Sequence, residues 1–260
     1  MKLEGGSDLT GNTRQSDPHS FKGDLLIMYS CFRKISVLAV SICLYTGCDQ
    51  SAQEEIVYIP DSAFLAALIA NGVDQNSDKL ISYTEAEGKG SLLIPPSGIT
   101  DLTGLEAFIQ LDSLSITLNP LEGIDLSGNR ALRYLECSSC ELTSLDLSNN
   151  LLLEELICNR NLLRDLDLSL NQSLVRLTCK NNLLTSLDLS ANRNLIKMVS
   201  CGNQLTRLDI SKHPTLTIIG VDNMPMLTEV CVWTLPFPPE GVSVIKGFSP
   251  NINFITTCNW

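Results

Sequence analysis

A period of 21 residues runs through the middle of this sequence. A four-residue motif of an aliphatic residue, Asp, a second aliphatic residue and Ser recurs at that spacing, beginning at Ile124, Leu145, Leu166, Leu187 and Leu208. A fixed repeat of this length is the signature of stacked structural units. Each unit buries its apolar residues only against the next unit, so the stack shares one continuous core. The sequence therefore predicts a repeat solenoid with short parallel strands.

The other columns of the repeat separate into leucine positions and polar turn positions. Apolar residues recur at Leu111, Leu132, Leu153, Leu174, Leu195 and Leu216, at Leu114, Leu135, Leu156, Leu177, Met198 and Ile219, and at Leu121, Leu142, Leu163, Leu184 and Leu205. Asparagine recurs at Asn129, Asn150, Asn171 and Asn192, and again at Asn119, Asn161, Asn182 and Asn203, where Cys140 takes one place. Asparagine can hydrogen-bond backbone groups that a turn leaves open. We therefore expect leucines in the core and asparagines at the turns.

Three cysteines of the repeats are expected in the core. Cys137, Cys158 and Cys179 share one inward-facing column, where a free cysteine behaves as a small apolar residue. Neighbouring side chains of a ladder point the same way, which is a poor geometry for a disulfide. We therefore predict free thiols there. Cys231 and Cys258 lie outside this column, and the sequence leaves a disulfide between them open.

The repeat unit reads L-x-x-L-x-C-x-x-N-x-L-x-x-L-D-L-S-x-N-x-x over residues 111 to about 226. It resembles the bacterial leucine-rich repeats of the internalin type, and in particular their 21-residue cysteine-bearing variant, which is common in cell-surface proteins. The resemblance implies a right-handed, β-rich coil. It also implies a surface protein that binds a protein ligand through its repeats.

Residues 1–47 are interpreted as an N-terminal extension followed by a signal peptide, and not as a folded domain. Arg33 and Lys34 precede the apolar residues 35–45, an order typical of a secretory signal. The apolar run is too short to span a bilayer as a helix. Because signals rarely begin this far into a chain, Met28 is an alternative start to Met1.

The apolar run ends in a sequence that resembles a bacterial lipoprotein box, with small residues before Cys48 and an unusual Tyr45. The resemblance implies cleavage before Cys48, lipidation of Cys48, and export to the bacterial outer membrane or cell surface. Simple secretion and a retained membrane helix are the alternatives. Residues 48–58 are interpreted as a tether.

Residues 59–90 predict a small helical cap before the repeats. The helix begins at Asp61 and carries Phe64 and Leu68 at helical spacing. The oxygen-bearing residues that follow have the spacing of an EF-hand loop. The candidate calcium ligands are Asp74, Asn76, Asp78, the backbone carbonyl of Leu80, Ser82 and Glu85.

One position departs from the EF-hand pattern. Lys79 stands where that pattern has glycine for a sharp turn, and a left-handed lysine costs about 1–2 kcal/mol. A structural calcium ion is the first interpretation of this EF-hand-like cap. A helix-turn-helix held by hydrogen bonds is the alternative.

The repeats are assigned to residues 91–226, and residues 227–260 to a cap of strand and coil. Residues 227–232 are expected to form the last strand, because the prolines of residues 235–239 break the series. A terminal cap covers the exposed end of the core.

Nothing in the sequence indicates an enzyme. No nucleophile elbow, zinc-protease motif or phosphate loop occurs, and His213 is expected to be an exposed turn residue. The aspartates of the repeated motif are interpreted as turn residues, with a cation-binding stripe as the alternative. The net charge of −11 argues against nucleic acid as a partner.

Alternation along the strands predicts which residues face away from the core. The predicted binding face contains Tyr134, Glu136, Glu155, Ile157, Arg176, Thr178, Lys197 and Val199. We expect a monomeric, non-enzymatic protein that binds a protein ligand on this face. A structural envelope lipoprotein without a specific ligand is the first alternative. A carbohydrate-binding component of a nutrient-uptake system is the second, although the face holds one aromatic residue.

Overall fold

The computed structural model describes residues 54–249 and 251–258. The predicted signal segment, Cys48 and the beginning of the tether lie outside the described residues. Two helices, α2 (Ser62–Ala70) and α3 (Tyr83–Glu87), precede the first strand. No described helix has the length and apolar character needed to cross a membrane.

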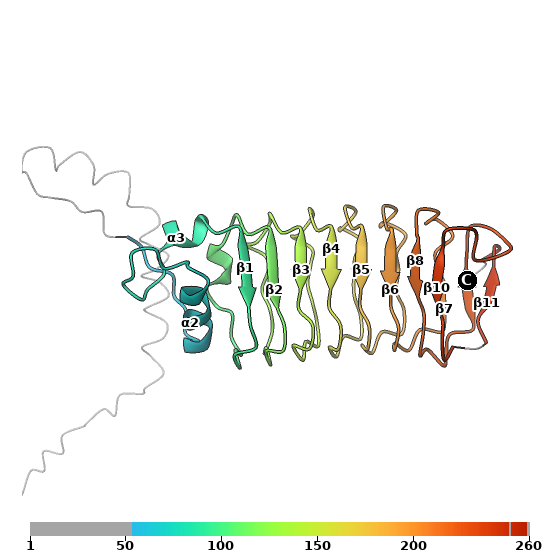
Figure 1. Cartoon of the computed structure of the whole chain (residues 1–260), viewed down its shortest axis with the longest axis horizontal. Helices are drawn as coiled ribbons and strands as arrows, with labels where there is room; N and C mark the ends of the chain where they lie inside the picture. Colours follow the sequence, from blue (N-terminus) through green and yellow to red (C-terminus); the bar gives the residue numbers. More distant parts are fainter. Residues whose placement is uncertain (1–53, 250, 259–260) are drawn as a thin grey trace, which may run out of the picture. The chain divides into compact units, whose positions relative to one another are not determined.

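The repeats form a parallel sheet in which strands follow one another along the solenoid (Figure 1). Eight strands pair in the order β1-β2-β3-β4-β5-β6-β8-β10, and a second sheet has the order β11-β9-β7. The strands are β1 (Ser91–Ile94), β2 (Ser113–Ile116), β3 (Tyr134–Glu136), β4 (Glu155–Ile157), β5 (Arg176–Thr178), β6 (Lys197–Val199), β7 (Arg207–Asp209), β8 (Ile218–Gly220), β9 (Glu229–Cys231), β10 (Ser243–Ile245) and β11 (Asn253–Ile255). A short 3-10 helix, η3 (Leu105–Ala107), lies between β1 and β2.

The register of the sheet reproduces the period of the sequence. Leu114 pairs with Leu135, Leu135 with Leu156, and Leu156 with Leu177. Each of these leucines is 0% exposed, because every second residue of a strand points to the same side. The expected solenoid of stacked parallel strands is therefore confirmed.

The predicted cysteine column is buried as expected. Cys137, Cys158 and Cys179 are free thiols with 0% exposure. Burial raises the pKa of the Cys158 and Cys179 thiols well above its usual range. A protonated, inaccessible thiol is a poor nucleophile, so these residues serve the core.

Asparagine side chains connect consecutive turns. Asn161 donates to the carbonyl oxygens of Cys137 and Cys158 at 2.8 and 3.1 Å, and accepts from the N–H groups of Cys140 and Leu142 at 3.0 and 3.1 Å. The residue before each member of this column is left-handed, with φ between 53° and 72° at Leu118, Ser139, Arg160, Asn181, Gly202 and Asn223. That bend turns the asparagine inward, where it satisfies backbone groups that have no ladder partner.

The prediction for His213 was wrong. Its side chain is 1% exposed, and Nε2 lies 3.0 Å from the carbonyl oxygen of Leu189. Asn192 makes the equivalent bond to Leu168 one repeat earlier, at 3.0 Å. His213 thus takes the fifth place in an asparagine column, because its ring nitrogen can replace an amide donor.

The last strand of the main sheet also differs from expectation. Residues 229–231 form β9 in the second sheet, and the main ladder continues at β10. Ile219 pairs with Val244, a step of 25 residues, because the proline-containing segment lengthens this turn of the solenoid. A disulfide joins Cys231 and Cys258, whose Cα atoms are 6.0 Å apart.

The segment before β1 is attached to the first coil through Asp61. One carboxylate oxygen accepts the N–H groups of Ala63 and Phe64 and so caps α2. The other oxygen accepts the N–H groups of Thr100 and Asp101 at 2.9 and 3.2 Å. Burial raises the pKa of Asp61, but these four hydrogen bonds outweigh it and the pKa is lowered.

Candidate functional site

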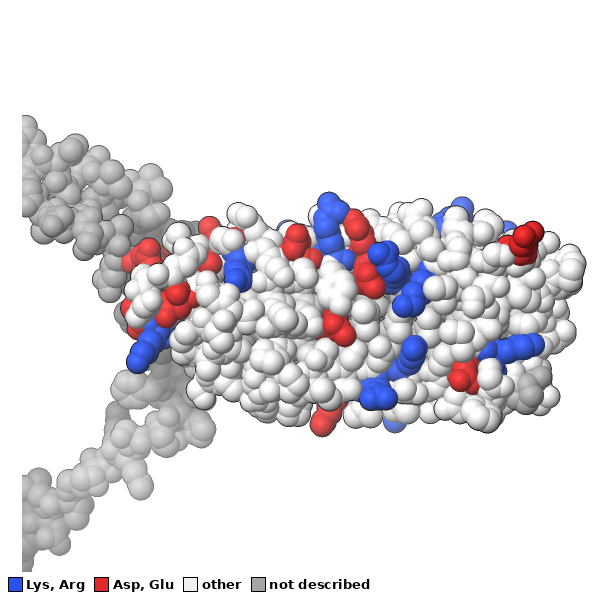
Figure 2. Space-filling view, viewed as in Figure 1, with Lys and Arg blue, Asp and Glu red and all other residues white. Residues whose placement is uncertain are grey.

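The eight residues of the predicted binding face lie on one side of β3 to β6. Tyr134, Glu155, Arg176 and Lys197 form one row of register partners, and Glu136, Ile157, Thr178 and Val199 form the next row. Figure 2 shows acidic and basic side chains close together over these middle strands. The structure therefore brings all eight residues into two adjacent rows.

The acidic part of the face is organised by Glu136. Its Oε2 accepts hydrogen bonds from the Tyr134 hydroxyl and the Ser115 hydroxyl, both at 3.0 Å. Burial, the hydrogen bond to Glu136 and the charges of Glu136 and Glu155 raise the pKa of Tyr134 to about 12. Tyr134 is thus a neutral hydrogen-bonded group at physiological pH. Ser115 was missed from sequence, although the 21-residue register places it beside Glu136.

The basic part of the face lies over β5 and β6. Arg176 forms an ion pair with Glu155 at 3.3 Å, and both residues keep part of their surface exposed. Lys197, the next residue of that row, has no ion pair within the part of the chain that the structure describes. A partly exposed charge without a local partner is available to an external one.

Thr178 and Val199 do not lie where a ligand can reach them freely. Their exposed fractions are 8% and 3%, so the prediction of two accessible contact residues is corrected. Both side chains are short, and their row neighbours lie on adjacent strands about 4.8 Å away. A Cβ atom at Gly220 would overlap Val199, which shows that Val199 fills the space above that glycine. Thr178, Val199 and Gly220 therefore form a part of the face that has little exposed side-chain surface.

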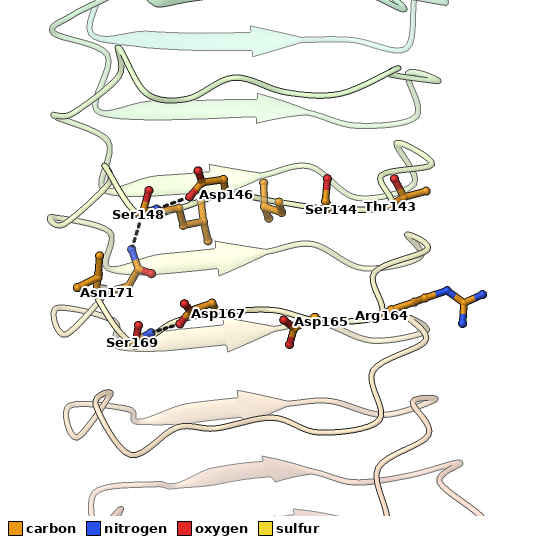
Figure 3. A pocket seen from close by; sticks show the side chains of 12 residues that line it. Thr143, Ser144, Asp146, Ser148, Arg164, Asp165, Asp167, Ser169 and Asn171 are labelled. Carbon is orange, nitrogen blue, oxygen red and sulfur yellow. Dashed lines mark hydrogen bonds between the residues drawn. The ribbon is translucent and has the colours of Figure 1, made fainter.

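A second surface feature follows the aspartates of the repeated motif. A shallow groove of about 360 Å³ is lined by Asp146, Ser148, Asp167 and Ser169, among others (Figure 3). Each aspartate accepts the N–H of the serine two residues later at 2.9 Å. Hydrogen bonds from these serines lower the pKa of Asp146 and Asp167. The carboxylates therefore stabilise the turns, as the simpler interpretation of the motif predicted.

The calcium-loop candidates lie between α2 and α3. Asp74 accepts the N–H of Lys79 at 3.0 Å, Asn76 accepts that of Asp78 at 2.9 Å, and Asp78 accepts that of Leu80 at 2.8 Å. Lys79 has a φ of 69°, so the lysine takes the left-handed conformation that the glycine of an EF-hand normally supplies. These hydrogen bonds from backbone N–H groups to side chains hold the loop in a curved conformation.

Glu85 is the most constrained of the predicted ligands. It is 8% exposed, and Oε1 accepts the N–H groups of Gln75 and Asn76 at 2.7 and 3.3 Å. Oε2 accepts the N–H and the hydroxyl of Ser82 at 2.9 and 3.0 Å. Burial raises the pKa of Glu85, but these hydrogen bonds prevail and lower it. Binding of both Glu85 oxygens to calcium would require the loop to release some of these donors.

One oxygen of the loop lacks a protein donor. Oδ1 of Asp74 is buried and accepts no hydrogen bond, although a buried polar atom without a partner costs free energy. A cation would satisfy this oxygen. The donor set of carboxylates, an amide oxygen, a hydroxyl and a backbone carbonyl also fits calcium.

Comparison with known proteins identifies the architecture. No protein-family model and no curated protein sequence matches the chain. Among solved structures, internalin C2 from Listeria monocytogenes is similar over 80% of this chain and 100% of its own, with a TM-score of 0.59 and 16% identity. The chain has the leucine-rich-repeat fold.

Two further leucine-rich-repeat structures are similar to parts of the chain. YopM, described as a leucine-rich effector protein from Yersinia pestis, is similar over 64% of this chain, with a TM-score of 0.52 and 27% identity. A leucine-rich-repeat protein from Leptospira interrogans is similar over 60% of it, with a TM-score of 0.50 and 18% identity. The matches cover 44% and 41% of those two proteins, so the chain corresponds to less than half of either.

Proposed function

We propose that this protein is a non-enzymatic scaffold that binds a protein partner on the face formed by β3 to β6. The observation that carries the proposal is the pair of in-register rows on this face, in which Tyr134, Glu136 and Arg176 are oriented by their neighbours. Rigid, pre-oriented polar groups lose little conformational entropy on binding. Repeat solenoids with such extended faces are suited to macromolecular partners.

The test is capture of partners with charge-reversed variants. Arg176→Glu together with Lys197→Glu changes the face without entering the core. Arg193→Glu together with Lys212→Glu is the matched control, since both residues are exposed and lie outside the strands. We expect an identified partner to bind the face variant at least about tenfold more weakly, a loss of about 1.4 kcal/mol, and the control unchanged.

Equal binding of every identified partner to wild type and both variants would contradict the proposed face. A protein that binds no partner but is needed for envelope integrity would support the structural alternative. Binding to immobilised polysaccharides that is lost on Tyr134→Ala would support carbohydrate capture.

For residues outside the described part of the chain, we propose export and lipid anchoring at Cys48. The support is the lipoprotein-like sequence before Cys48, and several acyl chains give stable membrane attachment. Cells that express the full chain should incorporate labelled palmitate into it, and the Cys48→Ala variant should incorporate none. Labelling that persists in that variant would refute the anchor.

We further propose that the protein is a monomer. Light scattering of the protein without its lipid should give the mass of one chain.

We also propose a structural role for calcium in the loop between α2 and α3. The support is the buried, unpartnered Oδ1 of Asp74 together with the left-handed Lys79. Melting with calcium and with a chelator should give a higher midpoint in calcium, and Asp74→Asn should remove the difference. An unchanged midpoint for the wild type would exclude this role.

A further inference from the structure

Three side chains that can bind a transition metal meet at one edge of the second sheet. Asp209 ends β7 and Cys231 ends β9, and these two residues are direct register partners. Ile255 ends β11 and is the partner of Cys231 on the other side, and Cys258 follows it closely in sequence. One carboxylate oxygen and the two sulfur atoms lie within 4.8 Å of one another. Parallel strands end at the same edge, which explains the convergence.

Asp209 differs from the other aspartates of its column in its surroundings. Asp188 and Asp209 make the same turn, each accepting the N–H of the serine two residues later at 2.8 Å. Among the described aspartates of this column, Asp209 is the one whose carboxylate oxygen lies within 4.8 Å of two sulfur atoms. The turn fixes its carboxylate with one oxygen, so the second oxygen can bind an ion.

The ligand types and their burial fit zinc. Zinc binds thiolates at about 2.3 Å and carboxylates at about 2.0–2.2 Å in a tetrahedron, which separates ligand atoms by about 3.3–3.8 Å. In the oxidised protein the two sulfur atoms are bonded to each other, so they must separate to this spacing on reduction. The carboxylate oxygen of Asp209 already lies within 4.8 Å of both sulfur atoms. Cys231 is 1% exposed and Asp209 is exposed, so the cluster is closed on the protein side and open to solvent on the other. Water can therefore occupy the fourth position.

We propose that Asp209, Cys231 and Cys258 form a zinc site that opens when the disulfide is reduced. In the oxidised protein both sulfur atoms are held in the Cys231–Cys258 bond. An external dithiol supplies two electrons and two protons: the sulfur–sulfur bond breaks, both cysteines become thiols, and the dithiol becomes a disulfide. Zinc then displaces the two thiol protons, and Asp209 provides the third ligand. The same residues thus join β9 to the segment after β11 in either redox state.

The experiment uses the full chain, reduced with a dithiol and exchanged into anaerobic buffer without reductant. Zinc binding is measured by competition with a chelating dye. Cobalt replaces zinc as a probe, because thiolate ligands give it a charge-transfer absorption. We expect one metal ion per reduced chain with that absorption, and none for the oxidised chain. Asp209→Asn should weaken zinc binding about tenfold or more, a loss of about 1.4 kcal/mol or more, because the amide is a poor metal ligand but still accepts the turn hydrogen bond.

Matched variants make the outcome specific. Asp188→Asn changes the equivalent aspartate away from the sulfur atoms, and Cys201→Ser removes a half-buried free thiol. Both should bind zinc as the wild type does, whereas Cys258→Ser should lose the cobalt absorption. The proposal is overturned if the reduced chain binds no zinc, if the absorption survives Cys258→Ser, or if Asp209→Asn binds as tightly as Asp188→Asn. Circular dichroism of each reduced variant verifies that the solenoid is intact.

Discussion

The buried histidine of the repeat turns gives a direct test of the asparagine column. The side-chain amide of Asn192 donates to the carbonyl oxygens of Leu168 and Asn171 at 3.0 and 2.9 Å. The imidazole of His213 makes only the first of the two equivalent bonds, to Leu189 at 3.0 Å. Replacement of His213 by asparagine should therefore add one buried hydrogen bond, to the carbonyl oxygen of Asn192.

The expected magnitude follows from that single bond. A buried hydrogen bond contributes about 0.5–1.5 kcal/mol net, and the smaller asparagine fits because four preceding turns already contain it. We expect His213→Asn to raise the free energy of unfolding by about 1 kcal/mol, which corresponds to about 2–4 °C in the melting midpoint for a domain of this size. The reciprocal change, Asn192→His, should lower it, because it removes one bond and adds ring volume to a packed site.

Both variants can be measured by urea and thermal unfolding followed by circular dichroism. Equal urea slopes are required, because the comparison assumes the same surface is exposed on unfolding. The reasoning is refuted if His213→Asn is less stable than wild type, or if Asn192→His has the same stability as wild type. Either result would mean that these side-chain bonds do not control the column.

Two further predictions concern the sheet face. Because the pKa of Tyr134 is raised to about 12, its contribution to stability is present below about pH 10 and is lost as the pH rises toward 12. Ultraviolet titration should show a late phenol that is absent in Tyr134→Phe and shifted to lower pH in Glu136→Gln. A late phase that persists unchanged in Tyr134→Phe would contradict this. Gly220→Ala should cost about 1–3 kcal/mol, because the new Cβ overlaps Val199. Gly123→Ala is the control, since no atom lies within 4 Å of its Cβ, and adding Val199→Ala should recover stability. Equal stability of the two alanine variants would exclude the overlap.

The periodic part of the molecule was predictable because the same interactions recur in each turn. The columns of Leu114 and Cys137 lie in the core, and the column of Asn161 lies at the turns, as the sequence indicated. In such a stack each residue meets its equivalents one repeat away. A pattern visible in the sequence is therefore also a contact pattern in space.

The errors arose where neighbours in adjacent repeats differ. Alternation along a strand assigns Val199 to the outer side, but the side chain is buried and occupies the space above Gly220 in the next repeat. The continuation at β10 depends on a longer turn before it, which breaks the 21-residue count. Neither feature can be predicted from the position of a residue within its own repeat, because each depends on a neighbouring repeat.

The two polar columns also show why substitutions are accepted at some turns. Cys140 replaces an asparagine and still donates, through its thiol, to the carbonyl oxygen of Ile116 at 3.0 Å. Cys140 has no amide oxygen. It therefore cannot accept a backbone N–H in the way that Asn161 accepts the N–H of Leu142. One turn earlier, the N–H of Leu121 instead donates to the backbone carbonyl of Cys140 at 3.1 Å, so the backbone repairs the loss.

His213 needs no such repair, because its column uses the asparagine mainly as a donor. The amide oxygens of Asn129, Asn150 and Asn192 are buried and accept no hydrogen bond in the described structure, and Nδ1 of His213 has no partner either. A side chain with one well-placed N–H is therefore sufficient at these turns. The column of Asn161 uses the side chain as donor and acceptor together. At Cys140 a backbone carbonyl takes the place of the missing amide acceptor. Two columns that look alike as rows of asparagine thus impose different chemical requirements on their turns.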